Sequence, residues 1–238
     1  QEHLDADRRL MLEVALPLHQ ALHPGHRHAE SGDDVVKRVV REVLDDVCSR
    51  HSTRESLFPD TLRAIDRIKA FIRERGLITL PPDHDNFVVE PTPGFLDGVA
   101  VAFFNPPPIL EPDLKKSFWI SSVPRGGSPE KDRALEESFL REYNLYALQG
   151  LTIHEAFPGH YVQYGFALRS PFATVYKKIF SSGTFAEGWA VLAERMMFEN
   201  GYADGEPANL LIHLKQRLRV PLNAILDAAL HTREMTDE

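Results

Sequence analysis

The spacing of apolar residues predicts a chain built mostly of helices. Residues 3–22 carry apolar positions three and four residues apart, with charged residues between them, up to the Pro24-Gly25 pair. A second helix is expected from a cap at Asp33 or Asp34 to residue 47, and a third from Pro59 to Gly76. We interpret the apolar stripes as faces packed in a core, with a partner-helix surface as the alternative.

The stretch from residue 78 to 124 has a different pattern, with clustered prolines and short runs rich in Val, Phe and Ile. Such runs, at residues 86–90, 99–104 and 117–122, predict strands. Because prolines interrupt the runs, we expect a small antiparallel sheet with exposed edges. An exposed edge strand could bind the backbone of an extended peptide, or the segment could be a structural flap.

Helical periodicity returns at Ser128, which we expect to cap a helical region that continues to residue 153. Gly150 lies inside that region, which suggests close packing against another backbone. Further helices are expected after Ser170-Pro171, after a cap at Thr184, and from residue 206 to 231.

The whole pattern predicts a mainly α fold with a small antiparallel β-sheet, in the α+β class. We divide the chain into an N-terminal helical part (1–77), a proline-rich sheet part (78–125) and a second helical part (126–238), all within one continuous domain fragment. Near the C-terminus, Thr236 begins what looks like the cap of another helix, so the sequence is expected to be part of a longer protein.

Composition narrows the class of protein. The net charge of −8 argues against nucleic acid as the main partner, and no apolar run approaches the length of a membrane span. Cys48 is the only cysteine, which excludes an internal disulfide and a thiolate zinc cluster. His23, His26 and His28 could bind a metal, but we interpret them as solvated surface residues because no helix arranges an acidic partner beside them.

One stretch carries side chains typical of a catalytic zinc site. Glu155 follows His154 directly, His160 comes after a Pro-Gly pair, and Glu187 lies in a later Glu-Gly-Trp-Ala run. Two imidazoles and one carboxylate are three zinc-ligating groups that leave a fourth position open. The histidines are about 240° apart on a straight helix. The Pro158-Gly159 pair therefore predicts a two-residue bulge that turns His160 back toward His154.

These two runs also resemble a known family. His-Glu-Ala-Phe-Pro-Gly-His, followed by Phe-Ala-Glu-Gly-Trp-Ala at residues 185–190, is similar to the bacterial family catalogued as domain of unknown function 885. The resemblance extends more loosely over residues 87–231, and it includes the Leu-Arg-Glu-Tyr-Asn run at 140–144 and the Leu-His pair at 230–231. Members of that family look like zinc metallopeptidases with an HExxPGH helix, and they are about twice as long as this chain.

The resemblance implies a zincin-like, gluzincin-like helical catalytic domain. It implies His154, His160 and Glu187 as Zn2+ ligands and Glu155 as the general base. Many members carry a second histidine directly after Pro-Gly-His; this chain has Tyr161 there, so a role for that histidine does not transfer.

Three more residues are candidates for supporting roles. Glu194 shares a helix face with Glu187, and it could accept a hydrogen bond from a ligand histidine or form an outward salt bridge. Tyr161 and His231 are weak candidates for stabilising a developing oxyanion or binding substrate. All three assignments are predictions from spacing and residue type.

We therefore expect a zinc-dependent hydrolase, with a peptide or small amide as substrate. A metallopeptidase is favoured by the family resemblance alone. The alternatives are a metal-dependent amidase or esterase with the same ligands, and a non-catalytic helical binding or scaffold module that keeps the motif as a packed polar core. The sequence does not indicate the oligomeric state, and Gln1 begins no readable signal peptide, so the cellular location is open.

Overall fold

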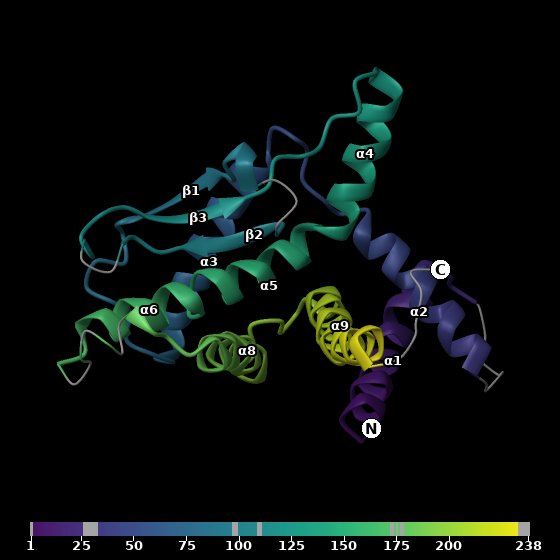
Figure 1. Cartoon of the computed structure of the whole chain (residues 1–238). Helices are drawn as coiled ribbons and strands as arrows, with labels where there is room; N and C mark the ends of the chain where they lie inside the picture. Colours follow the sequence, from purple (N-terminus) through teal and green to yellow (C-terminus); the bar gives the residue numbers. More distant parts are fainter. Residues whose placement is uncertain are drawn as a thin grey trace. The chain divides into compact units, whose positions relative to one another are not determined.

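The chain forms two compact units. The computed structural model describes residues 2–25, 33–96, 100–108, 111–171, 174, 176 and 179–232. One unit is made of Gln1–Ser49 with Ala203–Glu238, and the other of Arg50–Tyr202. This grouping differs from the parts 1–77, 78–125 and 126–238 drawn from composition, because helices from the two ends of the chain pack together. Figure 1 labels the elements of both units.

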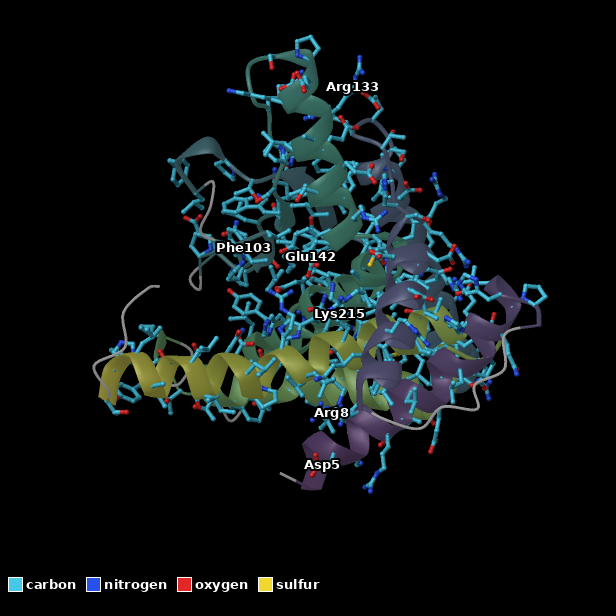
Figure 2. All side chains as sticks on the ribbon, turned by 90° about the vertical axis from the view of Figure 1, so that its right-hand side faces the viewer. Asp5, Arg8, Phe103, Arg133, Glu142 and Lys215 are labelled. Carbon is cyan, nitrogen blue, oxygen red and sulfur yellow. The ribbon has the colours of Figure 1, made fainter. Side chains whose placement is uncertain are left out.

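The first unit contains the helices α1 (Glu2–Leu22), α2 (Asp33–Cys48) and α9 (Pro207–Thr232). Helix α1 contacts both of the others. The apolar stripe of α2 is buried at Val39, Val43 and Val47, which confirms that this stripe faces a core. Figure 2 shows the side chains of these helices from another side, with Arg8 on α1 and Lys215 on α9. None of the described helices is long and apolar enough to span a bilayer.

The second unit combines helices with a small sheet, so the prediction of a mainly helical α+β chain is confirmed. Its described helices are α3 (Leu57–Arg75), α4 (Pro129–Glu142), α5 (Leu145–Glu155), α6 (His160–Arg169) and α8 (Gly183–Glu199). Its strands are β1 (Phe87–Pro91), β2 (Ala102–Asn105) and β3 (Lys116–Ile120). A short 3-10 helix, η1 (Gly94–Leu96), lies between β1 and β2.

The sheet is mixed, whereas the sequence predicted an antiparallel one. Its order is β1-β3-β2, with β2 antiparallel to β3 and β1 parallel to β3. Strand β3 is the most buried of the three, and it lies at the centre between the two strands that precede it. Strands β1 and β3 run in the same direction, and β2 runs in the opposite direction. A chain that reverses direction at each strand gives an antiparallel sheet only when successive strands are neighbours. Because β3 lies between β1 and β2 in the sheet, its pair with β1 is parallel.

The sheet and helix α8 lie on opposite sides of α5 (Figure 1). Strand β2 contacts α5 on one side, and α8 contacts both α5 and α6. Phe104 of β2 packs against Tyr161 and Tyr164 of α6. Phe103, labelled in Figure 2, points to the other face of the sheet and meets Trp119 edge to face. Helix α5 is therefore held between the sheet and α8.

Asn144 divides the helical region expected from Ser128 to residue 153 into two helices, α4 and α5. The backbone of Asn144 is extended, and its side-chain oxygen accepts hydrogen bonds from the N–H groups of Tyr146 and Ala147, both at 3.1 Å. Because Asn144 is the N-cap of α5, this helix begins separately from α4, which ends at Glu142. The expected close contact at Gly150 is wrong, because a Cβ there would meet no described atom within 4 Å.

Other boundaries also differ in detail. Ser182, rather than Thr184, caps α8, and its Oγ accepts a hydrogen bond from the N–H of Phe185 at 3.2 Å. Several residues of the helix expected after Ser170-Pro171 lie outside the described residues. His26, His28 and Thr236 also lie outside them.

Candidate metal centre

Two helices meet at the motif, where the sequence predicted one helix with a bulge. Helix α5 ends at Glu155 and α6 begins at His160, so residues 156–159 form a sharp connection between them. The N–H of Gly159 donates to the carbonyl of Ile153 at 3.0 Å, which folds the connection back onto the end of α5. A Cβ at Gly159 would lie 1.7 Å from the carbonyl oxygen of His154. Only glycine allows this approach without a shift of the backbone.

Replacing Gly159 with Ala is expected to destabilise the second unit by about 3 kcal/mol or more, because the added methyl group would overlap a carbonyl that cannot move alone. Gly150→Ala in α5 is the matched control. It adds a methyl group where no described atom lies within 4 Å, and should be neutral or stabilise by up to about 1 kcal/mol. Denaturant unfolding measures both, and equal stabilities for the two variants would contradict the close approach.

The structure brings His154, His160 and Glu187 together, as the sequence predicted. Nε2 of His154 lies 3.4 Å from Oε2 of Glu187, and Nε2 of His160 lies 3.6 Å from Oε1 of the same carboxylate. The two imidazole rings are perpendicular, with centroids 4.8 Å apart. One possible ligand atom from each residue lies within 4.8 Å of the other two. The histidines are mostly buried, whereas the side chain of Glu187 is 66% exposed, so the cluster is open toward solvent.

Helix α8 holds the cluster from one side through two further residues. Nδ1 of His154 donates to Oε1 of Glu194 at 2.6 Å, which is the bond that the sequence allowed for Glu194. This bond directs the other nitrogen, Nε2, toward Glu187. Trp189 donates its indole N–H to the carbonyl of Pro158 at 2.9 Å and so ties α8 to the connection between α5 and α6. The sequence carries no signal for this role of Trp189, since its partner is a backbone oxygen.

Glu155, which follows His154 on α5, is held by a strand of the sheet. Its Oε2 accepts a hydrogen bond from the backbone N–H of Phe104 in β2 at 2.8 Å. Burial raises the pKa of the Glu155 carboxyl to about 7, although the charge of His154 and the Phe104 bond act in the other direction. A carboxyl group with a pKa near neutrality can both accept and return a proton. Phe104 contributes through its main chain, for which the sequence carries no signal.

The two histidines differ in their affinity for protons. Burial lowers the pKa of His154, but the hydrogen bond and charge of Glu194 outweigh it, so the pKa is raised overall. Burial and the neighbouring charge of His154 lower the pKa of His160. His160 is therefore the imidazole that is more readily neutral, which is the form that binds a metal ion.

Tyr161 does not join this cluster in the structure. Tyr161 is fully buried, and its hydroxyl donates to the carbonyl of Asp83 at 2.9 Å. Burial also raises the pKa of this phenol. Tyr161 is thus a core residue that ties α6 to the segment before β1. His231 lies on α9 in the first unit, with Nδ1 2.8 Å from the carbonyl of Asp227, and its role in substrate binding stays a prediction.

The fold and this cluster define a mainly helical α+β protein with a His-His-Glu set of possible metal ligands beside a buried glutamate. The chain belongs to the family of bacterial proteins of unknown function called DUF885, whose sequence profile matches residues 15–238. No curated protein matches the sequence.

The solved structures that are similar to this chain include two bacterial proteins. One is a protein of unknown function from Shewanella oneidensis, described as a candidate lipoprotein, with 31% sequence identity and a TM-score of 0.76. The match covers 96% of this chain and 38% of that one. The other is a candidate lipoprotein from Colwellia psychrerythraea, with 21% identity, a TM-score of 0.71, and 99% and 36% of the two chains covered. The second likeness concerns the fold alone. This chain spans less than two fifths of either protein.

Proposed function

We propose that the protein is a zinc-dependent hydrolase and, more specifically, a metallopeptidase. The convergence of His154, His160 and Glu187 from three different elements, with Glu155 next to the first histidine, is the observation that carries this proposal. The other support is the combination of His-Glu-x-x-Pro-Gly-His and Glu-Gly-Trp-Ala in one chain. Because the chain is shorter than its structural relatives, the activity is assigned to the full-length protein.

The donor atoms fit a zinc ion. Ligand atoms bound to one tetrahedral zinc at 2.0–2.1 Å are about 3.3 Å apart. Each histidine nitrogen lies at close to that distance from its nearer oxygen of Glu187: 3.4 Å from His154 to Oε2 and 3.6 Å from His160 to Oε1. One ligand atom from each residue lies within 4.8 Å of the other two. His154, His160 and Glu187 would hold the ion, and Glu194 would orient His154. Zinc bound by three protein ligands supplies a water of lowered pKa and an electrophile for a carbonyl oxygen.

In this proposal, Glu155 moves the proton that hydrolysis requires. In the proposed reaction, its carboxylate accepts a proton from the attacking water and later passes it to the leaving amine. The Phe104 N–H holds one carboxylate oxygen at 2.8 Å and so limits the rotation of the side chain. The other oxygen can face the reacting groups.

Strand β2 offers support for a peptide as the substrate. Within the described sheet it is an edge strand, and its Phe104 N–H donates to the proposed base, so Glu155 lies beside this strand. An extended peptide that paired with this edge would place a backbone carbonyl near Glu155. Esters and small amides lack a long backbone for such pairing. A comparison of peptides with blocked esters and acyl amides therefore separates a peptidase from the amidase and esterase alternatives.

Metal content tests the proposal directly. Purified full-length protein is expected to contain about one zinc per chain at the His154 cluster, and chelation is expected to remove hydrolysis of a peptide library, with recovery on addition of zinc. The rival scaffold hypothesis also accommodates the His154–Glu194 bond, but it predicts neither metal nor chelator sensitivity. Protein that binds no divalent metal and hydrolyses none of the peptides would remove the hydrolase proposal.

A further inference from the structure

Two histidines of α1 and a glutamate of α2 form a second cluster, in the first unit. Nε2 of His19 lies 2.7 Å from Oε2 of Glu42, and Nε2 of His23 lies 3.6 Å from the same oxygen. The imidazole rings have centroids 4.6 Å apart. As in the His154 cluster, one possible ligand atom from each of His19, His23 and Glu42 lies within 4.8 Å of the other two.

We propose that His19, His23 and Glu42 form a second binding site for a divalent transition metal ion such as zinc, which links α1 to α2. The imidazole and carboxylate ligands favour zinc and neighbouring transition metals over calcium or magnesium, which prefer oxygen ligands alone. The ligands of this site all belong to the first unit, whereas the proposed catalytic residues belong to the second.

The backbone of α1 places the two imidazoles on one face. His23 follows His19 by four residues, which puts their side chains one helical turn apart. Although α1 ends at Leu22, the N–H of His23 donates to the carbonyl of His19 at 2.9 Å, so the helical turn includes His23. A pair of histidines at this spacing is a recognised arrangement for binding zinc from one helix face. Glu42 supplies the third ligand from the neighbouring helix.

A simple ion pair accounts for only part of this geometry. One protonated imidazole would satisfy the charge of Glu42, yet both Nε2 atoms lie near the same carboxylate oxygen. Two imidazolium ions at this separation would repel each other. In the tautomer with its proton on Nδ1, a neutral imidazole presents the lone pair of Nε2, and two such lone pairs beside one carboxylate oxygen form the set of donors that a shared cation binds. A metal ion satisfies all three groups at once. The 3.6 Å separation of His23 and Glu42 is close to the value of about 3.3 Å between two ligands of tetrahedral zinc, and the 2.7 Å separation of His19 and Glu42 is that of the hydrogen bond which an ion would replace.

The burial of the ligands also suits a site that is fixed on one side and open on the other. His19 is 2% exposed, so its ring is held by the packing of α1. The side chains of His23 and Glu42 are 51% and 42% exposed, which gives an ion access from solvent. Binding would replace the direct hydrogen bond between His19 and Glu42 with two bonds to the metal.

The test separates the two proposed sites. In full-length protein carrying His154→Ala and His160→Ala, titration with zinc chloride near neutral pH is expected to show about one bound equivalent. Adding His23→Ala should weaken this binding by more than about 100-fold, since loss of even an outer partner of a ligand costs 10- to 100-fold. Gln20→Ala is the control: it removes an exposed polar side chain from the same turn of α1 and should leave the affinity unchanged.

Circular dichroism first verifies that each variant is folded. If the double background variant does not fold, the same question is answered in the otherwise unaltered protein by whether His23→Ala removes one equivalent of bound zinc. A Kd weaker than about 1 mM in a folded background variant would overturn the second site. So would binding that His23→Ala leaves unchanged in either protein. If the catalytic proposal failed, these results would be unchanged, because the background variant already lacks His154 and His160.

Discussion

Replacing Glu155 with Gln is expected to reduce turnover of peptide substrates by about 100- to 10,000-fold, the range that a general base contributes. Gln has nearly the same shape, and its carbonyl oxygen can still accept the hydrogen bond from Phe104. It cannot accept the proton of the attacking water. The content of bound zinc should be unchanged, because Glu155 is not one of the three converging ligands. Steady-state kinetics and metal analysis of the same full-length preparation measure the two quantities.

The matched control for this variant is Glu137→Gln. Glu137 is an exposed residue of α4 that pairs with Arg141 one helical turn away, and its replacement should leave turnover at the wild-type level. If Glu155→Gln were as active as this control, Glu155 would not be the base, and the proton acceptor would have to be sought elsewhere in the full-length protein.

Replacing Glu187 with Ala is expected to weaken zinc binding by more than about 100-fold, and with it to remove activity. The carboxylate oxygens of Glu187 lie within 3.6 Å of Nε2 of His154 and of His160. Without Glu187, the two imidazoles would have no carboxylate ligand in common. The side chain is mostly exposed, and its truncation should therefore cost little stability. Calorimetric titration with zinc measures the affinity, and thermal unfolding measures the stability.

Glu199→Ala is the control for this second variant. Glu199 is also an exposed glutamate of α8, and it pairs with Arg195 four residues earlier. Its loss removes the same charge from the same helix and should leave zinc affinity unchanged. Equal affinities for Glu187→Ala and Glu199→Ala would show that the cluster at His154 and His160 is not a zinc site.

Local sequence patterns predicted most of the helices and the positions of the strands. Val39, Val43 and Val47 recur at helical spacing, and the stripe they form is buried as expected. The order of the strands could not be predicted in this way. The strand pattern of β3 does not show that it lies between β1 and β2, since that position depends on the packing of the sheet against α3 and α5.

The two glycines of the motif region illustrate the same limit. Gly150 and Gly159 both interrupt an apolar helical pattern, and close packing was expected at Gly150. The structure shows open space at Gly150 and a close approach to a carbonyl at Gly159. Sequence alone shows that glycine permits a close contact. Whether another group is present to make that contact is decided by the path of the backbone.

The second cluster shows a similar difference. The histidines near the end of α1 were interpreted as solvated because no acidic partner was visible near them in the sequence. In the sequence, His23 stands directly before the Pro24-Gly25 pair, whereas His19 lies in the preceding helical pattern. Glu42 follows His19 by 23 residues, and the packing of α2 against α1 brings it within 2.7 Å.

The sequence by itself determined the helical character of the chain, the types of side chain in the motif, and the need for a break between His154 and His160. These properties depend on neighbouring residues and on the intrinsic preferences of proline and glycine. The tertiary structure decided that Glu187 meets both histidines, that Glu194 orients His154, and that the Phe104 N–H restrains Glu155. Those contacts join residues 27 or more positions apart, because α5 is packed between β2 and α8.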